Sequence, residues 1–210
     1  LVNGQVAGMG QQVEEADTVQ VGKKILQGKQ TQKVLAFYKP VGVTCTERDP
    51  HAEKKIMDMI RYPERLTYAG RLDKDSEGLI LLTNDGDLIN AMMRGANRHE
   101  KEYIVKTDRE ITPDFLEKMA KGIYLKDLDI TTRECEIEQI GKFTFRIVLT
   151  QGVNRQIRRM CEACGYRVKA LKRIRIMNIL LGDLKPGKWR EITGEELEQL
   201  QRDTGMLNRN

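Results

Sequence analysis

Residues 70–83 of this 210-residue chain read GRLDKDSEGLILLT. The first nine letters place six charged or hydroxyl side chains between two apolar segments. The last five, residues 79–83, form an apolar run that ends in Thr, which is typical of a strand buried on both faces. The stretch therefore predicts a polar loop that leads directly into a strand of the core.

The segments on either side of this stretch mix strands and helices without strict βαβ alternation. Further strands are predicted at residues 34–38, 66–69, 102–107, 134–140, 143–149, 166–177 and 188–192. Helices are predicted at residues 53–61, 85–94, 112–121, 154–164 and 194–202. Pro113 suits a first helical position, and Gly165 suits a helix end. This order favours an α+β fold with a curved, mostly antiparallel sheet and flanking helices.

The first 33 residues differ in character from the rest of the chain. An Asn-Gly pair at residues 3–4 and the alternating residues 17–21 predict two short strands. Two strands bury too little for a core of their own, so residues 1–21 are expected to be the end of a small module. Residues 22–33, rich in Lys, Gln and Gly, are predicted to be a linker, and residues 34–205 the main domain.

Composition narrows the class of protein. The net charge is +5 and the isoelectric point about 9.0, which suits a polyanionic partner. No apolar run approaches the roughly 20 residues of a membrane span, so a cytoplasmic protein is expected. Cys161 and Cys164 form a Cys-x-x-Cys pair, but zinc needs two more ligands, and His51 and His99 are the only histidines. Two small residues on a helix is the simpler interpretation, and no metal site is expected.

The carboxylates of the 70–78 loop resemble a calcium site only in part. Residues 73–78 match the first half of a calcium-binding loop. Leu81 and Asn84 then occupy the ninth and twelfth positions, where a calcium loop requires oxygen ligands, including a bidentate Glu. Calcium is therefore excluded, and from composition alone an ordinary charged surface loop remains an alternative.

Positive charge is concentrated at residues 155–175. This window holds eight Lys or Arg residues and one acid, Glu162, for a local net charge of +7, whereas the whole chain carries +5. Such a local surplus is the pattern expected of phosphate binding. Arg155 and the Arg158–Arg159 pair would share one face of the predicted helix. A solvated basic face is the alternative.

Four short motifs follow one another along the main domain. They are KPVGV at residues 39–43, AGRLD at 69–73, KEY at 101–103 and NRQIRR at 154–159. The AGRLD motif is weak evidence by itself, but four motifs in this order and spacing are specific. In them the chain resembles the pseudouridine synthases of the RsuA/RluF group, and the resemblance covers about residues 34–202.

The resemblance implies an isomerase that detaches the base of a uridine, turns it and rejoins it through carbon 5, without cofactor or metal. It implies that Asp73 is the catalytic carboxylate, acting on the sugar as a nucleophile or as a base. An ionised carboxylate in a partly dry site needs a cation partner, and Arg158 matches the family position. Tyr103, by itself a typical core tyrosine, matches the family tyrosine that stacks on the target base.

The resemblance also implies that the target nucleotide leaves its stack, since the reacting atoms are shielded inside it. Arg71 matches the arginine that fills the resulting gap, and Ile174 or Ile176 is expected beneath the flipped base. The other basic residues are expected to bind RNA phosphates: Arg155, Arg159, Lys169, Lys172 and Arg173.

Ribosomal RNA is the partner that the resemblance implies, with 23S large-subunit RNA as the first candidate and transfer RNA left open. A monomer without membrane attachment is expected. Residues 1–21 resemble the end of the small alpha-L RNA-binding module that precedes the catalytic domain in this group.

Two other classes of function remain open at this level. A non-catalytic RNA-binding or ribosome-assembly protein would carry the same basic cluster, but it does not require Asp73, Tyr103 and Arg158 together. A metal-dependent nuclease would use four aspartates, Asp73, Asp75, Asp85 and Asp87. Helix capping explains the last two adequately.

Overall fold

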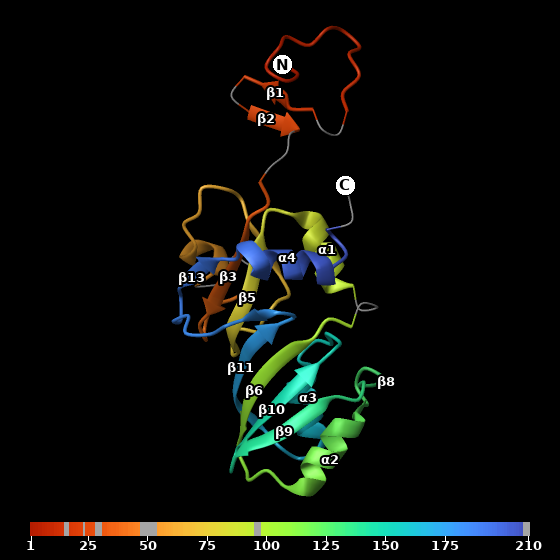
Figure 1. Cartoon of the computed structure of the whole chain (residues 1–210). Helices are drawn as coiled ribbons and strands as arrows, with labels where there is room; N and C mark the ends of the chain where they lie inside the picture. The colour runs from red at the N-terminus through yellow and green to blue at the C-terminus, as the bar shows by residue number, and fades with distance from the viewer. Residues whose placement is uncertain (15–16, 23, 28–30, 47–53, 95–97, 208–210) are drawn as a thin grey trace. The chain divides into compact units, whose positions relative to one another are not determined.

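The computed structural model describes residues 1–14, 17–22, 24–27, 31–46, 54–94 and 98–207. The chain divides into two compact units, Leu1–Gln32 and Lys33–Asn210, whose elements are labelled in Figure 1. Within the described ranges, every helix is too short or too polar to cross a lipid bilayer.

The N-terminal unit contains a small two-stranded sheet. β1 (Val19–Val21) pairs antiparallel with β2 (Lys24–Gln27). The prediction of a linker over residues 22–33 is therefore wrong in part, because four of its residues supply the ladder partner of β1. That residues 1–21 end an RNA-binding module stays a prediction.

The predicted turn at Asn3 and Gly4 is present. Both residues have positive φ, which is the backbone conformation of a tight hairpin turn. The Asn3 side chain accepts from the Thr18 N–H at 2.8 Å and donates to the Asp17 carboxylate at 2.7 Å. These bonds tie the start of the chain to the segment that enters β1.

The main unit is organised around one open sheet. Hydrogen-bonded neighbours follow the order β13-β3-β5-β11-β6-β10-β9, with β4 beside β5 and β12 beside β11. The strands are β3 (Val34–Lys39), β4 (Thr67–Ala69), β5 (Glu77–Thr83), β6 (Lys101–Thr107), β9 (Glu136–Gly141), β10 (Thr144–Leu149), β11 (Val168–Ile176), β12 (Ile179–Leu180) and β13 (Trp189–Glu191). A separate ladder joins β7 (Tyr124–Leu125) to β8 (Ile130–Thr131). All strand pairs of the open sheet are antiparallel except β5–β11, so the predicted mostly antiparallel α+β fold is confirmed.

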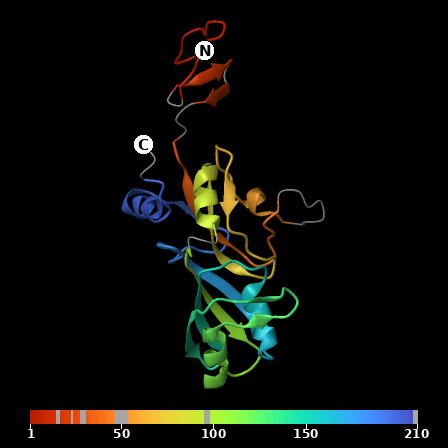
Figure 2. The ribbon, with the colours of Figure 1, turned by 90° about the vertical axis from the view of Figure 1, so that its right-hand side faces the viewer.

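Helices cover both faces of the sheet. They are the 3-10 helix η1 (Ile56–Met59), α1 (Gly86–Met93), α2 (Pro113–Lys121), α3 (Gln156–Ala163) and α4 (Gly194–Asp203). α1 and α4 pack on one face of β3 and β5 through Leu88 and Leu200, and η1 packs on the other through Ile56. Figure 2 shows α4 and η1 on opposite sides of these strands. α2 and α3 cover β6 and β10 through Phe115 and Met160.

Two helix starts follow directly from local sequence. The Asp85 carboxylate accepts from the backbone N–H groups of Asp87 and Leu88 at 2.9 and 3.1 Å, so it caps α1 as predicted. The Thr112 hydroxyl accepts from Phe115 N–H at 3.2 Å ahead of the proline that opens α2. Each cap satisfies backbone donors that the first turn of a helix leaves free.

The helix predicted at residues 53–61 is much shorter in the structure. Residue 53 lies outside the described residues, and only Ile56–Met59 forms a helix, of the 3-10 type. Lys55, just before it, is extended and bridges to Thr44, which prevents the helix from starting earlier. The prediction was wrong because the strand-like contact with Thr44 was not visible in the local periodicity.

The two halves of the sheet join at a glycine. Gly78 of β5 lies opposite Arg173 of β11 in the parallel pair, with φ of +111°. A Cβ on Gly78 would come within 2.2 Å of the Arg173 carbonyl oxygen and 2.7 Å of its nitrogen. Both the backbone conformation and the lack of space therefore require glycine.

We expect Gly78→Ala to lower the free energy of unfolding by about 3 kcal/mol or more, because β5 and β11 must separate to admit the methyl group. Gly182→Ala controls for backbone strain alone, since φ there is +55° and an added Cβ would meet nothing within 4 Å. Urea denaturation of both variants measures the difference. A loss for Gly78→Ala no larger than that for Gly182→Ala would contradict the steric argument.

Candidate active site

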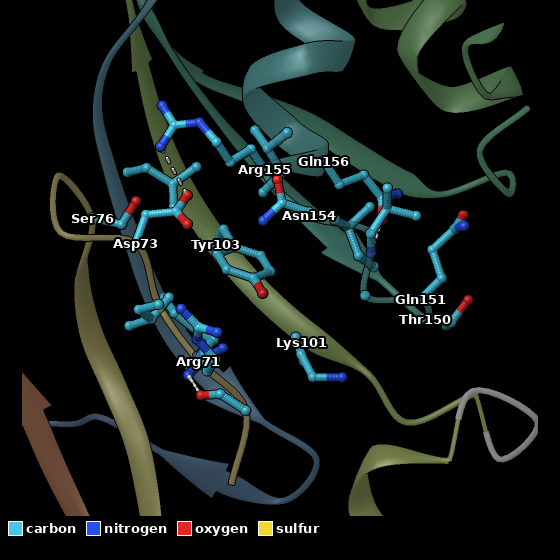
Figure 3. A pocket seen from close by; sticks show the side chains of 18 of the residues that line it. Arg71, Asp73, Ser76, Lys101, Tyr103, Thr150, Gln151, Asn154, Arg155 and Gln156 are labelled. Atoms are coloured by element: carbon cyan, nitrogen blue, oxygen red, sulfur yellow. Dashed lines mark hydrogen bonds and ion pairs between the residues drawn. The ribbon is translucent and has the colours of Figure 1, made fainter. Parts of the chain in front are cut away.

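A cavity of about 420 Å³ opens in the main unit. Its walls come from the loop at residues 70–76, strand β6, residues 149–155, the first turn of α3, and β11. Figure 3 shows side chains from these segments converging on the cavity. Asp73, Tyr103 and Arg158, predicted from three separate motifs, all line it.

Asp73 lies in the loop between β4 and β5, and its side chain is about one-third exposed. Its Oδ2 is 3.4 Å from a guanidinium nitrogen of Arg155. The Ser76 N–H donates to the Asp73 carbonyl at 3.1 Å, so a turn fixes the backbone here. The carboxylate thus has a cation beside it and remains accessible from the cavity.

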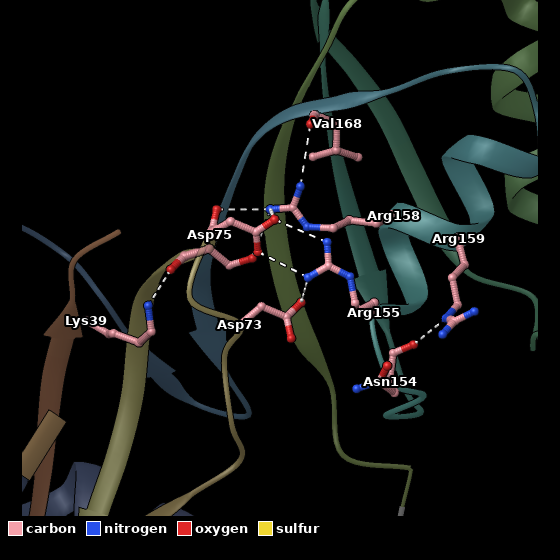
Figure 4. Close-up of polar contacts among 9 residues, drawn as sticks. Lys39, Asp73, Asp75, Asn154, Arg155, Arg158, Arg159 and Val168 are labelled. Carbon is pink, nitrogen blue, oxygen red and sulfur yellow. Dashed lines mark hydrogen bonds and ion pairs between the residues drawn. The ribbon is translucent and has the colours of Figure 1, made fainter. Parts of the chain in front are cut away.

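Arg155 also engages the next carboxylate of the loop. Its guanidinium donates to both oxygens of Asp75, at 3.3 and 3.2 Å (Figure 4). Burial by itself would raise the pKa of Asp75, but the Arg155 hydrogen bonds and the charges of Arg158 and Arg155 outweigh it, and the pKa is lowered. Arg155 precedes α3 with φ of +52° and ψ of +32°, an uncommon left-handed conformation for a non-glycine residue.

Arg158 does not make the ion pair with Asp73 that the sequence suggested. Its guanidinium donates to the Asp75 carbonyl at 3.0 Å and the Ser76 hydroxyl at 3.2 Å, and it lies 3.3 Å from the Asp75 carboxylate. Its Nε is buried without a hydrogen-bond partner among the described residues. Arg155, one turn earlier, takes the place beside Asp73.

Three cations hold the 70–76 loop by its backbone carbonyls. Arg173 donates to Gly70 at 3.0 Å, Arg158 donates to Asp75, and Lys39 donates to Ser76 at 2.7 Å. Lys39 is fully buried, and burial lowers the pKa of its ammonium, although nearby carboxylates including Asp73 oppose the shift. The loop carrying Asp73 is therefore fixed through its main chain.

Arg173 is a buried structural residue and cannot act as the phosphate contact that was predicted. It is 1% exposed, and its Nε donates to the Leu79 carbonyl at 2.7 Å in addition to the Gly70 bond. The error has a physical cause, because a strand alternates its side chains and this one turns inward at the β5–β11 join. Its guanidinium satisfies carbonyl groups that are buried with it.

The other predicted RNA-binding residues differ in their surroundings. Arg71 is exposed and lines the cavity, and Lys169 is exposed on β11. Arg159 forms an ion pair with Asp127 and donates to the Asn154 carbonyl at 3.0 Å. Lys172 lies 5.0 Å from the centre of the Tyr38 ring, and Tyr38 belongs to the cluster packed around α1 and α4. Lys172 therefore points to the sheet face opposite the cavity.

Leu171 is the apolar residue that β11 contributes to the cavity lining. Its side chain is buried, at 7% exposed. Ile174 and Ile176, the predicted candidates, pack instead into the cluster around α1 and α4. They occupy the alternate positions of the strand, so their side chains face the other side of the sheet.

Lys101 is a lining residue to which the sequence analysis gave no role. It lies two residues before Tyr103 on β6. Because residues two apart on a strand share a face, its place in the site followed from that of Tyr103.

The Cys-x-x-Cys pair lies on α3 away from the cavity lining. Cys161 is fully buried, and burial raises the pKa of its thiol to about 12, while the pKa of Cys164 is also raised by burial. Protonated thiols are poor nucleophiles and poor metal ligands. Within the part of the chain that the structure describes, no group of three or more metal-ligating side chains is gathered.

Comparison with known proteins bears directly on this site. A family model described as RNA pseudouridylate synthase matches residues 33–163, more than half of the chain. The chain belongs to the RNA pseudouridine synthases. The family suggested by the four sequence motifs is thereby confirmed. The matched segment of the synthase includes Asp73, Tyr103 and Arg158 but ends before β11, whose Leu171 and Arg173 complete the cavity.

Individual relatives agree with this assignment. The synthase is 43% identical over 201 residues to the dual-specificity RNA pseudouridine synthase RluF of Escherichia coli K12. The aligned residues make up 95% of this chain and 68% of that protein. It is 31% identical to the ribosomal large subunit pseudouridine synthase B of Pseudomonas aeruginosa, across 98% of this chain and 56% of the relative. A crystal structure of pseudouridylate synthase matches with a TM-score of 0.76 and 27% identity, covering 95% of this chain and 87% of that one.

We expect Arg173→Ala to destabilise the synthase by roughly 3 kcal/mol, because two buried carbonyls lose a charged donor and a cavity is left. The loss should persist at high salt, since buried interactions are weakly screened. Lys169→Ala, exposed on the same strand, should change the free energy of unfolding by less than about 0.5 kcal/mol. Thermal and urea unfolding test both. A stable Arg173→Ala protein with weakened RNA binding would restore the phosphate role.

Proposed function

We propose that this synthase isomerises a uridine of ribosomal RNA and that Asp73 is its catalytic carboxylate. The main support is the composition of the cavity. Among the described residues that line it, Asp73 is the only acid, and five Lys or Arg residues besides the buried Arg173 also line it: Arg71, Arg94, Lys101, Arg155 and Arg158. Such a cavity attracts a polyanion and offers one carboxylate to react with it.

The chemistry requires an ionised carboxylate near the sugar. The bond between C1′ and N1 breaks, and its electron pair leaves with the base. Asp73 then forms a bond to C1′ or removes a proton from C2′, and Arg155, 3.4 Å away, supplies the counter-charge in either case. After the base turns, C5 bonds to C1′ while the Asp73–C1′ bond breaks or Asp73 returns the proton to C2′. The base then loses the proton at C5 and gains one at N1.

Arg158 acts on this step as a positioning residue. It affects the position of Asp73 indirectly, because its guanidinium donates hydrogen bonds to the Asp75 carbonyl and the Ser76 hydroxyl of the same loop. Its Nε, buried without a partner among the described residues, is a donor that remains available if the Asp73 carboxylate moves when substrate arrives.

The target nucleotide must enter the cavity outside its stack, because a base inside a helix shields its reacting atoms. Tyr103 offers an aromatic face to the base, and Leu171 offers an apolar surface beside it. Arg71, exposed at the start of the loop, can occupy the gap that the nucleotide leaves. Base–aromatic stacking of about 1–3 kcal/mol offsets part of the unstacking cost.

The relatives make large-subunit ribosomal RNA the first candidate substrate, since the name of the Pseudomonas enzyme refers to that subunit. We expect one pseudouridine of 23S RNA to disappear in cells that lack the gene and to return when the gene is restored. Sequencing of pseudouridines in ribosomal and transfer RNA from both strains measures this. A site lost only from transfer RNA would contradict the ribosomal assignment.

We expect Asp73→Asn to abolish isomerisation while it preserves the fold and RNA binding, since the change is nearly isosteric but removes the charge. Release of tritium from RNA labelled at C5 of uridine measures the reaction, because that hydrogen is lost when the new bond forms. Asp87→Asn, an exposed acid in the first turn of α1, is the control and should keep full activity. Turnover by pure Asp73→Asn protein would assign the catalytic role to another residue.

A further inference from the structure

Lys101 is a cation of the cavity that the steps above leave unused. Its ammonium makes no hydrogen bond or ion pair with any residue that the structure describes. Neighbouring cations are engaged, since Arg155 pairs with Asp73 and Asp75, and Arg173 binds two carbonyl groups. Lys101 is therefore free to bind a group that enters the cavity.

The position of Lys101 places it near a base that stacks on Tyr103. The two residues share a face of β6 and lie about 7 Å apart along the strand. Figure 3 shows both side chains among those that line the cavity, with Tyr103 between Asp73 and Lys101. With the sugar at Asp73, the base of the same nucleotide extends over Tyr103 toward the Lys101 side.

The surroundings of Lys101 suit a charge that arises inside the site. The residue is half-buried, and this burial lowers the pKa of its ammonium. The positive charge of Arg173 lowers that pKa further. A poorly hydrated cation interacts strongly with an anion formed beside it, because little water screens the pair. Lys169, exposed on β11, has the surroundings expected of a lysine that contacts hydrated phosphates.

We propose that Lys101 donates a hydrogen bond to an oxygen of the detached uracil and stabilises the negative charge that the base then carries. The inference rests on the proposed function. When the C1′–N1 bond breaks, uracil keeps the electron pair, and resonance spreads the charge over N1, O2 and O4. Lys101 keeps its proton throughout. The charge is consumed when C5 bonds to C1′. Loss of the C5 proton and gain of a proton at N1 then complete the neutral base of pseudouridine.

The first test separates rate from affinity. Lys101→Ala should lower the single-turnover rate on saturating RNA about 100-fold, the usual effect of removing one electrostatic donor, and leave RNA affinity unchanged. Lys106→Ala is the matched control, because Lys106 is exposed on the same strand but faces the opposite side of the sheet. It should change neither quantity. Lys101→Met, which keeps most of the side-chain volume, should repeat the alanine result and so excludes a packing defect.

The second test restores the ammonium. Lys101→Cys should be as slow as Lys101→Ala, and alkylation with 2-bromoethylamine should return most of the rate by rebuilding a side chain with a terminal ammonium. The unmodified enzyme, treated identically, controls for the native thiols. Cys45 and Cys161 are buried, and burial raises the pKa of the Cys135 and Cys164 thiols, so all four should react slowly.

Two results would overturn the proposal. A normal saturated rate with weaker binding, and a salt slope reduced by about 0.7–0.9, would make Lys101 a phosphate contact. A rate and affinity both equal to those of the unmodified enzyme would leave it without a role in the reaction. Asp73→Asn is assayed in parallel, because its activity would refute the proposed function itself, whatever the result at Lys101.

Discussion

The site depends on three cations that bind the backbone carbonyls of the 70–76 loop. Arg173 binds Gly70, Arg158 binds Asp75, and Lys39 binds Ser76. A loop with this many charged side chains would otherwise be stable in many conformations exposed to water. Bonds to its main chain fix the loop without using the carboxylate of Asp73, which stays beside Arg155 and open to the cavity. Charge-assisted bonds of this kind are stronger than neutral ones, particularly when buried.

The position of the same loop also depends on how two strands of the sheet, β5 and β11, pack against each other. Gly78, at the start of β5, lies so close to the Arg173 backbone that no side chain fits between the strands. The parallel β5–β11 pair joins the half of the sheet covered by α1 and α4 to the half covered by α2 and α3. Residues from both halves therefore meet at one place, with Asp73 from one side and Tyr103 from the other.

Charge in the basic segment serves more than one purpose. Most of its arginines have partners within the protein, such as Asp127 for Arg159 and Glu102 for Arg175. The net charge of a sequence window thus overstates the charge available to RNA. The cavity itself still collects cations from the loop, β6 and α3, and it is there that we propose the polyanion binds.

The sequence by itself determined the features that depend on near neighbours. The Asp85 and Thr112 caps and the buried run before Asn84 follow from bonds and periodicity within a few residues. The order of four motifs identified the family and brought forward Asp73 and Tyr103. Only the tertiary structure decided that Arg173 turns inward and that Arg155 stands beside Asp73. Those outcomes depend on contacts between segments some 80 to 100 residues apart, and neither the period of a strand nor local charge specifies which distant carbonyl or carboxylate a side chain meets.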